Sequence, residues 1–129
     1  MGIKVKDAIL TIDIRKGRLR IFKAALHQLG DPKNIQLLIN PKAKVIAIRG
    51  ADELESTHNT LSVAHFLAPG GGDVDLYSDY LVRDMQAAFP ELSGRLSYHL
   101  QGIFQAKENM MCFPLSSLTE IQGKQSVEV

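Results

Sequence analysis

The chain has 129 residues, of which 45% are hydrophobic, and a formal net charge of +1, which predicts one domain over residues 1–129 with a substantial core. No apolar run approaches the ~20 residues of a membrane-spanning helix, and Met1–Leu10 lacks the apolar segment of a signal peptide. The single cysteine, Cys112, excludes an intrachain disulfide and a cysteine-based zinc site. We therefore expect a cytoplasmic protein with no membrane partner.

The charges are distributed unevenly along the chain. Residues 1–50 contain 11 Lys/Arg and 3 Asp/Glu, whereas residues 51–129 contain 4 Lys/Arg and 11 Asp/Glu. If the two halves occupy different faces, one face attracts an anionic partner, or unlike faces of two copies attract each other.

The first predicted element is a strand over Ala8–Ile14, in which apolar and polar residues alternate. Arg15–Gly17 predicts a hairpin turn, because glycine tolerates a positive φ, and Arg18–Phe22 predicts the returning strand. The turn and its flanks carry four basic side chains, namely Arg15, Lys16, Arg18 and Arg20. These side chains fit either a solvated strand face or a basic finger that touches nucleic-acid phosphates.

The next elements predict a short helix and a second hairpin. Lys23–Leu29 is rich in helix-forming residues, and Gly30 is a natural helix end. Asn34–Asn40 and Lys44–Arg49 have the apolar and β-branched content of strands. The Asn40-Pro41 pair predicts the turn between them, so the two strands should be antiparallel.

This region resembles a stretch of small uncharacterised bacterial proteins of similar length. The resemblance rests on FKAALHQLG at Phe22–Gly30, NIQLLINP at Asn34–Pro41 and VIAIR at Val45–Arg49. It implies a shared local structure, and it implies no activity and no functional residue.

The central segment is harder to assign. Ala51–Leu67 begins as a polar loop, and Leu61–Leu67 then predicts a strand, with a helix as the alternative. Ala68–Asp73 is glycine-rich and predicts a turn. It lacks the lysine and the helix start of a phosphate-binding P-loop.

The second half repeats the order of the first. Val74–Tyr77 predicts a strand, and Ser78 the N-cap of a helix that ends at Pro90. Strands over Arg95–Ile103 and Met110–Leu115 follow. The order strand–helix–strand–strand thus occurs over about residues 18–50 and again over 74–115.

This order predicts an α+β fold: an antiparallel sheet with two helices on one face, built from a duplicated β-α-β-β unit. The arrangement is similar to the TATA-binding-protein-like fold and to single domains of DNA sliding clamps. The apolar periodicity predicts eight buried side chains: Leu26, Leu29, Leu37, Ile46, Leu81, Met85, Leu100 and Phe113. Apolar residues on the opposite sheet face, such as Leu38 and Val45, predict a homo-oligomer, most simply a two-fold dimer.

Few residues suggest chemistry. His58, His65, Asp73 and Asp75 are the candidates for an enzyme or ligand site, but no nucleophile, base and orienting group share a recognisable spacing. We expect Cys112 in the core, and the aromatic residues at core positions give little support for stacking on single strands. No motif indicates a metal or another cofactor, and we predict no catalytic residue.

The leading hypothesis is a non-enzymatic binding protein, nucleic-acid-associated or regulatory, that acts through its basic N-terminal half. The expected phosphate contacts are Arg15, Lys16, Arg18, Arg20, Lys42 and Lys44. One alternative is a self-assembling structural or interaction protein. The other is an enzyme or ligand-binding protein that uses the central loop. The expected partners are a nucleic acid, another protein or a second copy of the chain.

Overall fold

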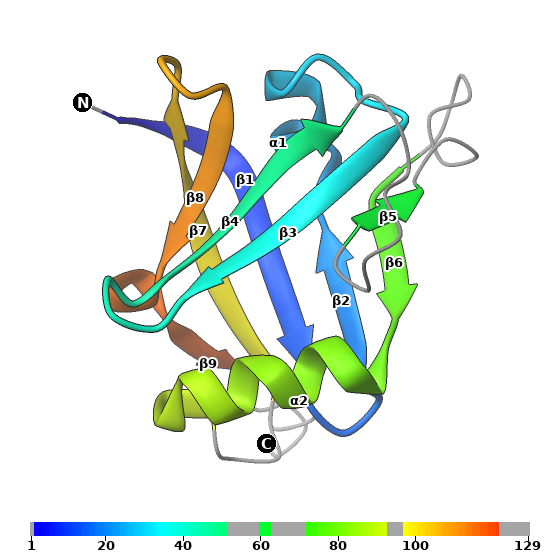
Figure 1. Cartoon of the computed structure of the whole chain (residues 1–129), viewed down its shortest axis with the longest axis vertical. Helices are drawn as coiled ribbons and strands as arrows, with labels where there is room; N and C mark the ends of the chain where they lie inside the picture. The colour runs from blue at the N-terminus through cyan, green and yellow to red at the C-terminus, as the bar shows by residue number, and fades with distance from the viewer. Residues whose placement is uncertain (1, 52–59, 63–71, 93–96, 122–129) are drawn as a thin grey trace, which may run out of the picture.

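A curled antiparallel sheet is the main feature of the computed structural model, which describes residues 2–51, 60–62, 72–92 and 97–121 (Figure 1). The strands are β1 (Ile3–Asp13), β2 (Arg18–Ile21), β3 (Asn34–Asn40), β4 (Val45–Ala51), β5 (Thr60–Ser62), β6 (Val74–Tyr77), β7 (Ser97–Gln105), β8 (Met110–Pro114) and β9 (Thr119–Ile121). The α-helices are α1 (Lys23–Gln28) and α2 (Asp79–Ala88), and single 3-10 turns follow at Pro90–Leu92 and Leu115–Ser117. These elements confirm the coarse expectation of an α+β chain with an antiparallel sheet and two helices.

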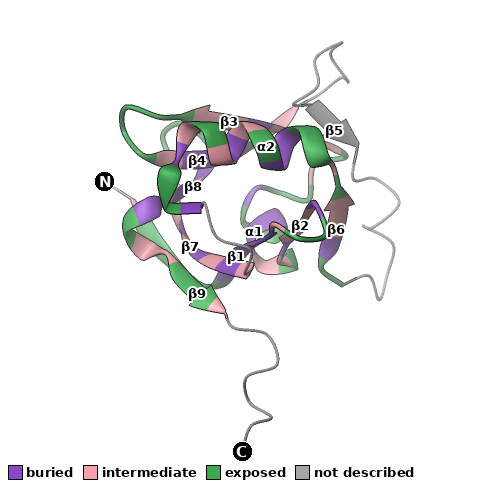
Figure 2. Ribbon diagram, turned by 90° about the horizontal axis from the view of Figure 1, so that it is seen from below, coloured by how far each residue is buried: buried purple, intermediate pink, exposed green. Residues whose placement is uncertain are grey.

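The sheet has the strand order β5-β3-β4-β8-β7-β1-β2-β6, and β9 pairs with β7. Each of these pairs is antiparallel. Figure 2 shows the strands arranged around the interior, with α2 across the near end. Helix α1 lies at the opposite end (Figure 1). The two helices therefore lie at opposite ends of a half-barrel. The half-barrel forms because a twisted sheet of this size curls around its own core.

The core contains the inward-facing residues of the strands together with one face of each helix. All eight residues predicted to be buried are buried, with no more than 6% of any of them exposed: Leu26, Leu29, Leu37, Ile46, Leu81, Met85, Leu100 and Phe113. The alternation of apolar and polar residues was therefore a correct guide to the inner face of the sheet.

The second hairpin also forms as predicted. Strands β3 and β4 pair from Asn34↔Ala51 to Asn40↔Val45, and no helix occurs between Asn34 and Arg49. In the turn, the Asn40 side-chain oxygen accepts hydrogen bonds from the amides of Lys42 and Ala43, at 3.1 and 3.0 Å. An asparagine that satisfies the backbone in this way favours the turn.

The structure does not show the predicted duplicated β-α-β-β unit. Strand β2 pairs with β1 and β6, and β4 pairs with β8, so the two halves of the chain share one sheet.

The observed strands also differ from the predicted ones in two places. Strand β1 begins at Ile3, five residues before the predicted start at Ala8, and only Thr60–Ser62 is described as strand in the central segment. The remainder of the predicted Leu61–Leu67 strand and most of the glycine-rich turn lie outside the described residues.

Candidate functional site

The basic first half and the acidic second half of the chain are joined by ion pairs across the sheet. Strand β2 lies beside β6, with Arg20 opposite Asp75. The Arg20 guanidinium donates two hydrogen bonds to the Asp75 carboxylate, at 2.6 and 2.9 Å. These hydrogen bonds lower the pKa of Asp75 and raise the pKa of Arg20. The charge division along the sequence is therefore not a division between two faces here.

Two more of the predicted phosphate-binding residues have acidic partners. Arg18 lies 3.3 Å from Asp13 and 3.9 Å from Asp75. Lys44 lies 2.6 Å from Glu91, and its hydrogen bond lowers the pKa of that carboxyl. Arg18, Arg20 and Lys44 thus neutralise acidic groups of this chain, which weakens their attraction for an external anion.

Arg15, Lys16 and Lys42 are exposed, and no acidic side chain among the described residues forms an ion pair with them. They lie in two different turns. Arg15 and Lys16 belong to the β1–β2 turn, and Lys42 belongs to the β3–β4 turn. The structure therefore brings Arg15, Lys16, Arg18 and Arg20 together, and it places Lys42 and Lys44 in a separate region.

The β1–β2 turn is held firmly against the start of α2 (Figure 1). Inside the turn, the amide of Lys16 donates to Asp13 Oδ1 at 3.2 Å, and the amide of Gly17 donates to the Ile14 carbonyl at 3.3 Å. The Gly17 carbonyl accepts a hydrogen bond of 2.8 Å from the amide of Ser78, the N-cap residue of α2. Gly17 has φ +61°, and a Cβ at this position would collide with the Asp79 carboxylate. The close approach explains why glycine occupies this position.

Two exposed tyrosines flank this junction. The exposed fractions are 68% for Tyr77, the last residue of β6, and 54% for Tyr80, in the first turn of α2. Arg83 is exposed one helical turn after Tyr80. We call Arg15, Lys16, Tyr77, Tyr80 and Arg83 the tip patch; the exposed Asp79 is an anion within it.

The exposure of Tyr77 and Tyr80 corrects the expectation that the aromatic residues lie at core positions. Val74 is buried and Leu76 packs against the core, so the alternation along β6 directs Asp75 and Tyr77 to the outer side. That alternation was a signal from which the exposure of Tyr77 could have been inferred.

The outer face of β3, β4, β8 and β7 carries a second surface of interest. The strand register places Leu38 beside Ala47, Ala47 beside Cys112, and Cys112 beside Ile103. We call these four residues the outer apolar row; Ala47 is buried within it, the other three are half-buried, and none belongs to the core cluster. Cys112 is half-buried on this outer face, which corrects its predicted core position. Burial, and secondarily Glu108, raise the pKa of its thiol.

The carboxylates proposed for an enzyme have structural contacts. Asp75 is bound by Arg20, and Asp73 Oδ1 accepts a hydrogen bond of 2.9 Å from the amide of Lys23, the first residue of α1. This bond satisfies an amide that the helix itself leaves unpaired. The other two candidates, His58 and His65, lie outside the described residues.

His99, on β7, lies in a partly buried environment. Burial lowers its pKa, and the Phe22 ring meets the imidazole edge-on with 6.2 Å between ring centroids. Thr11, its neighbour in register, has a buried hydroxyl with no hydrogen-bond partner among the described residues. The hydroxyl and the imidazole are therefore not joined as a nucleophile and base would be.

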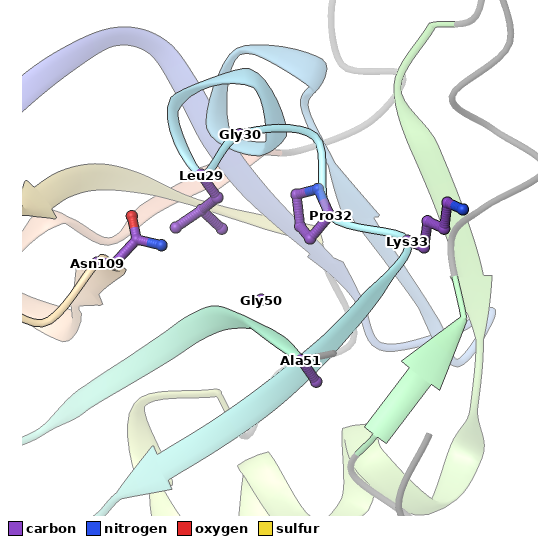
Figure 3. Close-up of a pocket in the computed structure, with 7 residues that line it drawn as sticks. All are labelled: Leu29, Gly30, Pro32, Lys33, Gly50, Ala51 and Asn109. Atoms are coloured by element: carbon purple, nitrogen blue, oxygen red, sulfur yellow. The ribbon is translucent and has the colours of Figure 1, made fainter. Parts of the chain in front are cut away.

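An open pocket of about 350 Å³ lies where the end of α1 approaches the end of β4 (Figure 3). The described lining residues are Leu29, Gly30, Pro32, Lys33, Gly50, Ala51 and Asn109. Lys33 is the one charged residue among these seven, and its side chain points away from the others in Figure 3. The described lining thus offers no pair of titratable groups for acid–base chemistry.

Within the described ranges, no three His, Cys, Asp or Glu side chains are placed to share a metal ion. Neither α1 nor α2, the α-helices of the described chain, has the length and hydrophobicity that a membrane crossing requires. No protein-family model matches the chain, and no curated protein or solved structure is significantly similar to it.

Proposed function

We propose that this protein is a non-enzymatic binding protein that contacts the phosphates of a nucleic acid through the tip patch. The main support for this proposal is which basic residues form ion pairs with acidic residues of the same chain and which do not. Arg15 and Lys16 are exposed and without an acidic partner among the described residues, whereas Arg18 and Arg20 hold Asp13 and Asp75. Free cations at a hairpin tip can reach a phosphate backbone without giving up an ion pair.

The rigidity of the turn supports this proposal. The hydrogen bond from Ser78 to Gly17 holds the tip against α2, so Arg15 and Lys16 project from a fixed backbone. A fixed backbone reduces the entropy lost when the ligand binds. Asp79 opposes binding because it places one negative charge beside the two cations.

A salt titration tests the proposal. Binding of a fluorescent oligonucleotide, measured as the duplex and as its single strand, should weaken as salt rises, because each neutralised phosphate releases counterions. Replacing both Arg15 and Lys16 with alanine should reduce the slope of log K against log[salt] by about 1.4 on the single strand, at roughly 0.7 per contact.

Lys42→Ala is the matched control, since Lys42 is an exposed, unpaired cation in a different turn of the described structure. It should leave the salt slope unchanged. If neither nucleic acid binds at low ionic strength, or if Lys42→Ala lowers the slope as much as the double variant does, the proposal is wrong.

Self-association is the second candidate function, and the outer apolar row is the observation that favours it. Leu38, Cys112 and Ile103 are only half-buried in the monomer and lie side by side across three strand pairs. A second copy packed on this face would remove them from water, most simply about a two-fold axis.

We propose the cytoplasm as the setting, because the single thiol suits a reducing compartment.

Sedimentation at micromolar concentrations tests this second candidate. The wild-type chain should sediment as a dimer, and Leu38→Lys should sediment as a monomer with unchanged circular dichroism. Mild oxidation should link the two Cys112 thiols if the two-fold axis passes near them. A wild-type monomer at every concentration would exclude dimerisation through this face.

A further inference from the structure

We infer that the tip patch selects single-stranded over double-stranded nucleic acid, with Tyr77 and Tyr80 as stacking platforms for unpaired bases. This inference rests on the proposed function and adds the class of nucleic acid to it. Its basis is the exposure of the two tyrosine residues, 68% and 54%, on either side of the Ser78 amide that holds the turn. The rings and the two free cations are thus parts of one junction.

The strand register supports a close arrangement. Arg18 lies opposite Tyr77 in the β2–β6 pair, and Gly17, which follows Lys16, is hydrogen-bonded to Ser78, which follows Tyr77. Tyr80 lies two residues beyond Ser78, and Arg83 lies one helical turn further along the same helix. The register therefore places cations and rings at one junction, and a single strand offers both phosphates and unpaired bases to such a surface.

A duplex cannot use the rings in this way. Its bases are stacked and paired, so an exposed tyrosine meets only the sugar–phosphate backbone or a groove edge. Unpaired bases present a flat face, and stacking of a base on an aromatic side chain is tolerant of sequence. The patch should therefore bind single strands with little base preference.

The surroundings of the tyrosines favour a nucleic acid over a protein partner. Protein-binding hot spots lie in well-packed pockets that exclude water. Asp79 between the two tyrosines in sequence, Lys16 in the adjoining turn and Arg83 one helical turn after Tyr80 are all exposed and charged. An unpaired base can stack on one tyrosine ring while the charged side chains around it stay in contact with water. A nucleic acid therefore fits these surroundings better than a protein partner does.

Tyrosine variants test the inference. Binding of one fluorescent oligonucleotide is compared as a single strand and as the matched duplex, for wild type, Tyr77→Ala, Tyr77→Phe and Tyr77→Leu, with the same set at Tyr80. Wild type should bind the single strand at least about tenfold more tightly, since each stacked base contributes at that level. The alanine and leucine variants should lose most of this preference and keep the salt slope, whereas phenylalanine should retain the preference.

The possible failures are distinct. Equal binding of both forms by wild type, with a slope that still depends on Arg15 and Lys16, would overturn the single-strand inference and leave the proposed function standing. Retention of the preference in the alanine variants would also overturn it. An absence of binding to either form would remove both, and capture of an acidic protein through the same tyrosines would then identify the patch as a protein-binding surface.

Discussion

Arg20 and Asp75 face each other across the β2–β6 pair, with a planar guanidinium aligned to a planar carboxylate at 2.6 and 2.9 Å. Bidentate geometry of this kind is the arrangement in which a partly exposed ion pair contributes most to stability. Arg18 approaches the same carboxylate at 3.9 Å, so Asp75 is the point at which two basic residues of β2 meet the second half of the chain.

A double-mutant cycle should measure this pair. Arg20→Ala and Asp75→Ala should show a coupling energy of about 1 kcal/mol near neutral pH, measured by chemical denaturation of the two single variants and the double variant. Because the pair lowers the folded-state pKa of Asp75, its contribution is complete above the unfolded value of about 4. It should disappear as the pH falls through the lower folded-state pKa. A coupling energy that does not change with acidity would contradict this account.

The charges of Arg20 and Asp75 are visible in the sequence, but the ion pair between them could not be predicted from it. The outward position of Arg18 and Arg20 followed from the alternation along β2. Their partner, however, lies 55 residues away from Arg20 and is reached only because β6 pairs with β2. Pairing between strands that are distant in sequence depends on the whole sheet, and no local pattern specifies it. For the same reason, the sequence could not predict that Arg15 and Lys16 have no acidic partner among the described residues.

The β1–β2 turn is fixed by its contact with α2. The Ser78 hydroxyl accepts a hydrogen bond from the amide of Leu81 at 3.2 Å, while the Ser78 amide donates to Gly17. One residue thus caps the helix and anchors the hairpin. The cap was predictable from a serine ahead of a helical pattern, whereas the anchor depends on a tertiary contact.

Gly17→Ala should reveal that anchor. The residue has φ +61°, and the added Cβ would collide with Asp79, so we expect a loss of roughly 1–3 kcal/mol in the free energy of unfolding. Gly30→Ala is the matched control, because Gly30 has φ +87° and open space at its Cβ position. Thermal and urea denaturation of both variants should show a larger loss at Gly17. Equal losses would mean that backbone strain alone acts and that the contact with α2 has no effect.

The two halves of the chain form one sheet through the β1–β7, β2–β6 and β4–β8 pairs. Hairpins with short turns, such as β3–β4, were predictable because adjacent strands pair locally. The curl of the sheet and the positions of the helices at its two ends were not, since periodicity identifies the buried face of a strand and not the curvature of the sheet. Charges of the two halves meet in this sheet at the Arg20–Asp75 pair and, beside it, at the Lys44–Glu91 contact.

This interleaving predicts a single cooperative unit. Because strands of each half complete their pairing with strands of the other half, fragments 1–50 and 72–129 should be unfolded separately and should regain strand content only when mixed. Circular dichroism of each fragment and of the equimolar mixture measures this. A stably folded fragment 1–50 would contradict the shared sheet and would support an independent half.

The tip patch is the proposed nucleic-acid-binding surface. The most direct test is a titration of the isotopically labelled chain with a short single-stranded oligonucleotide, followed by backbone amide chemical shifts. We predict that the shifts concentrate at residues 15–18 and 77–83 and that residues 40–45, around Lys42 and Lys44, do not change. Shifts centred on residues 40–45, or no shifts at low ionic strength, would contradict the claim.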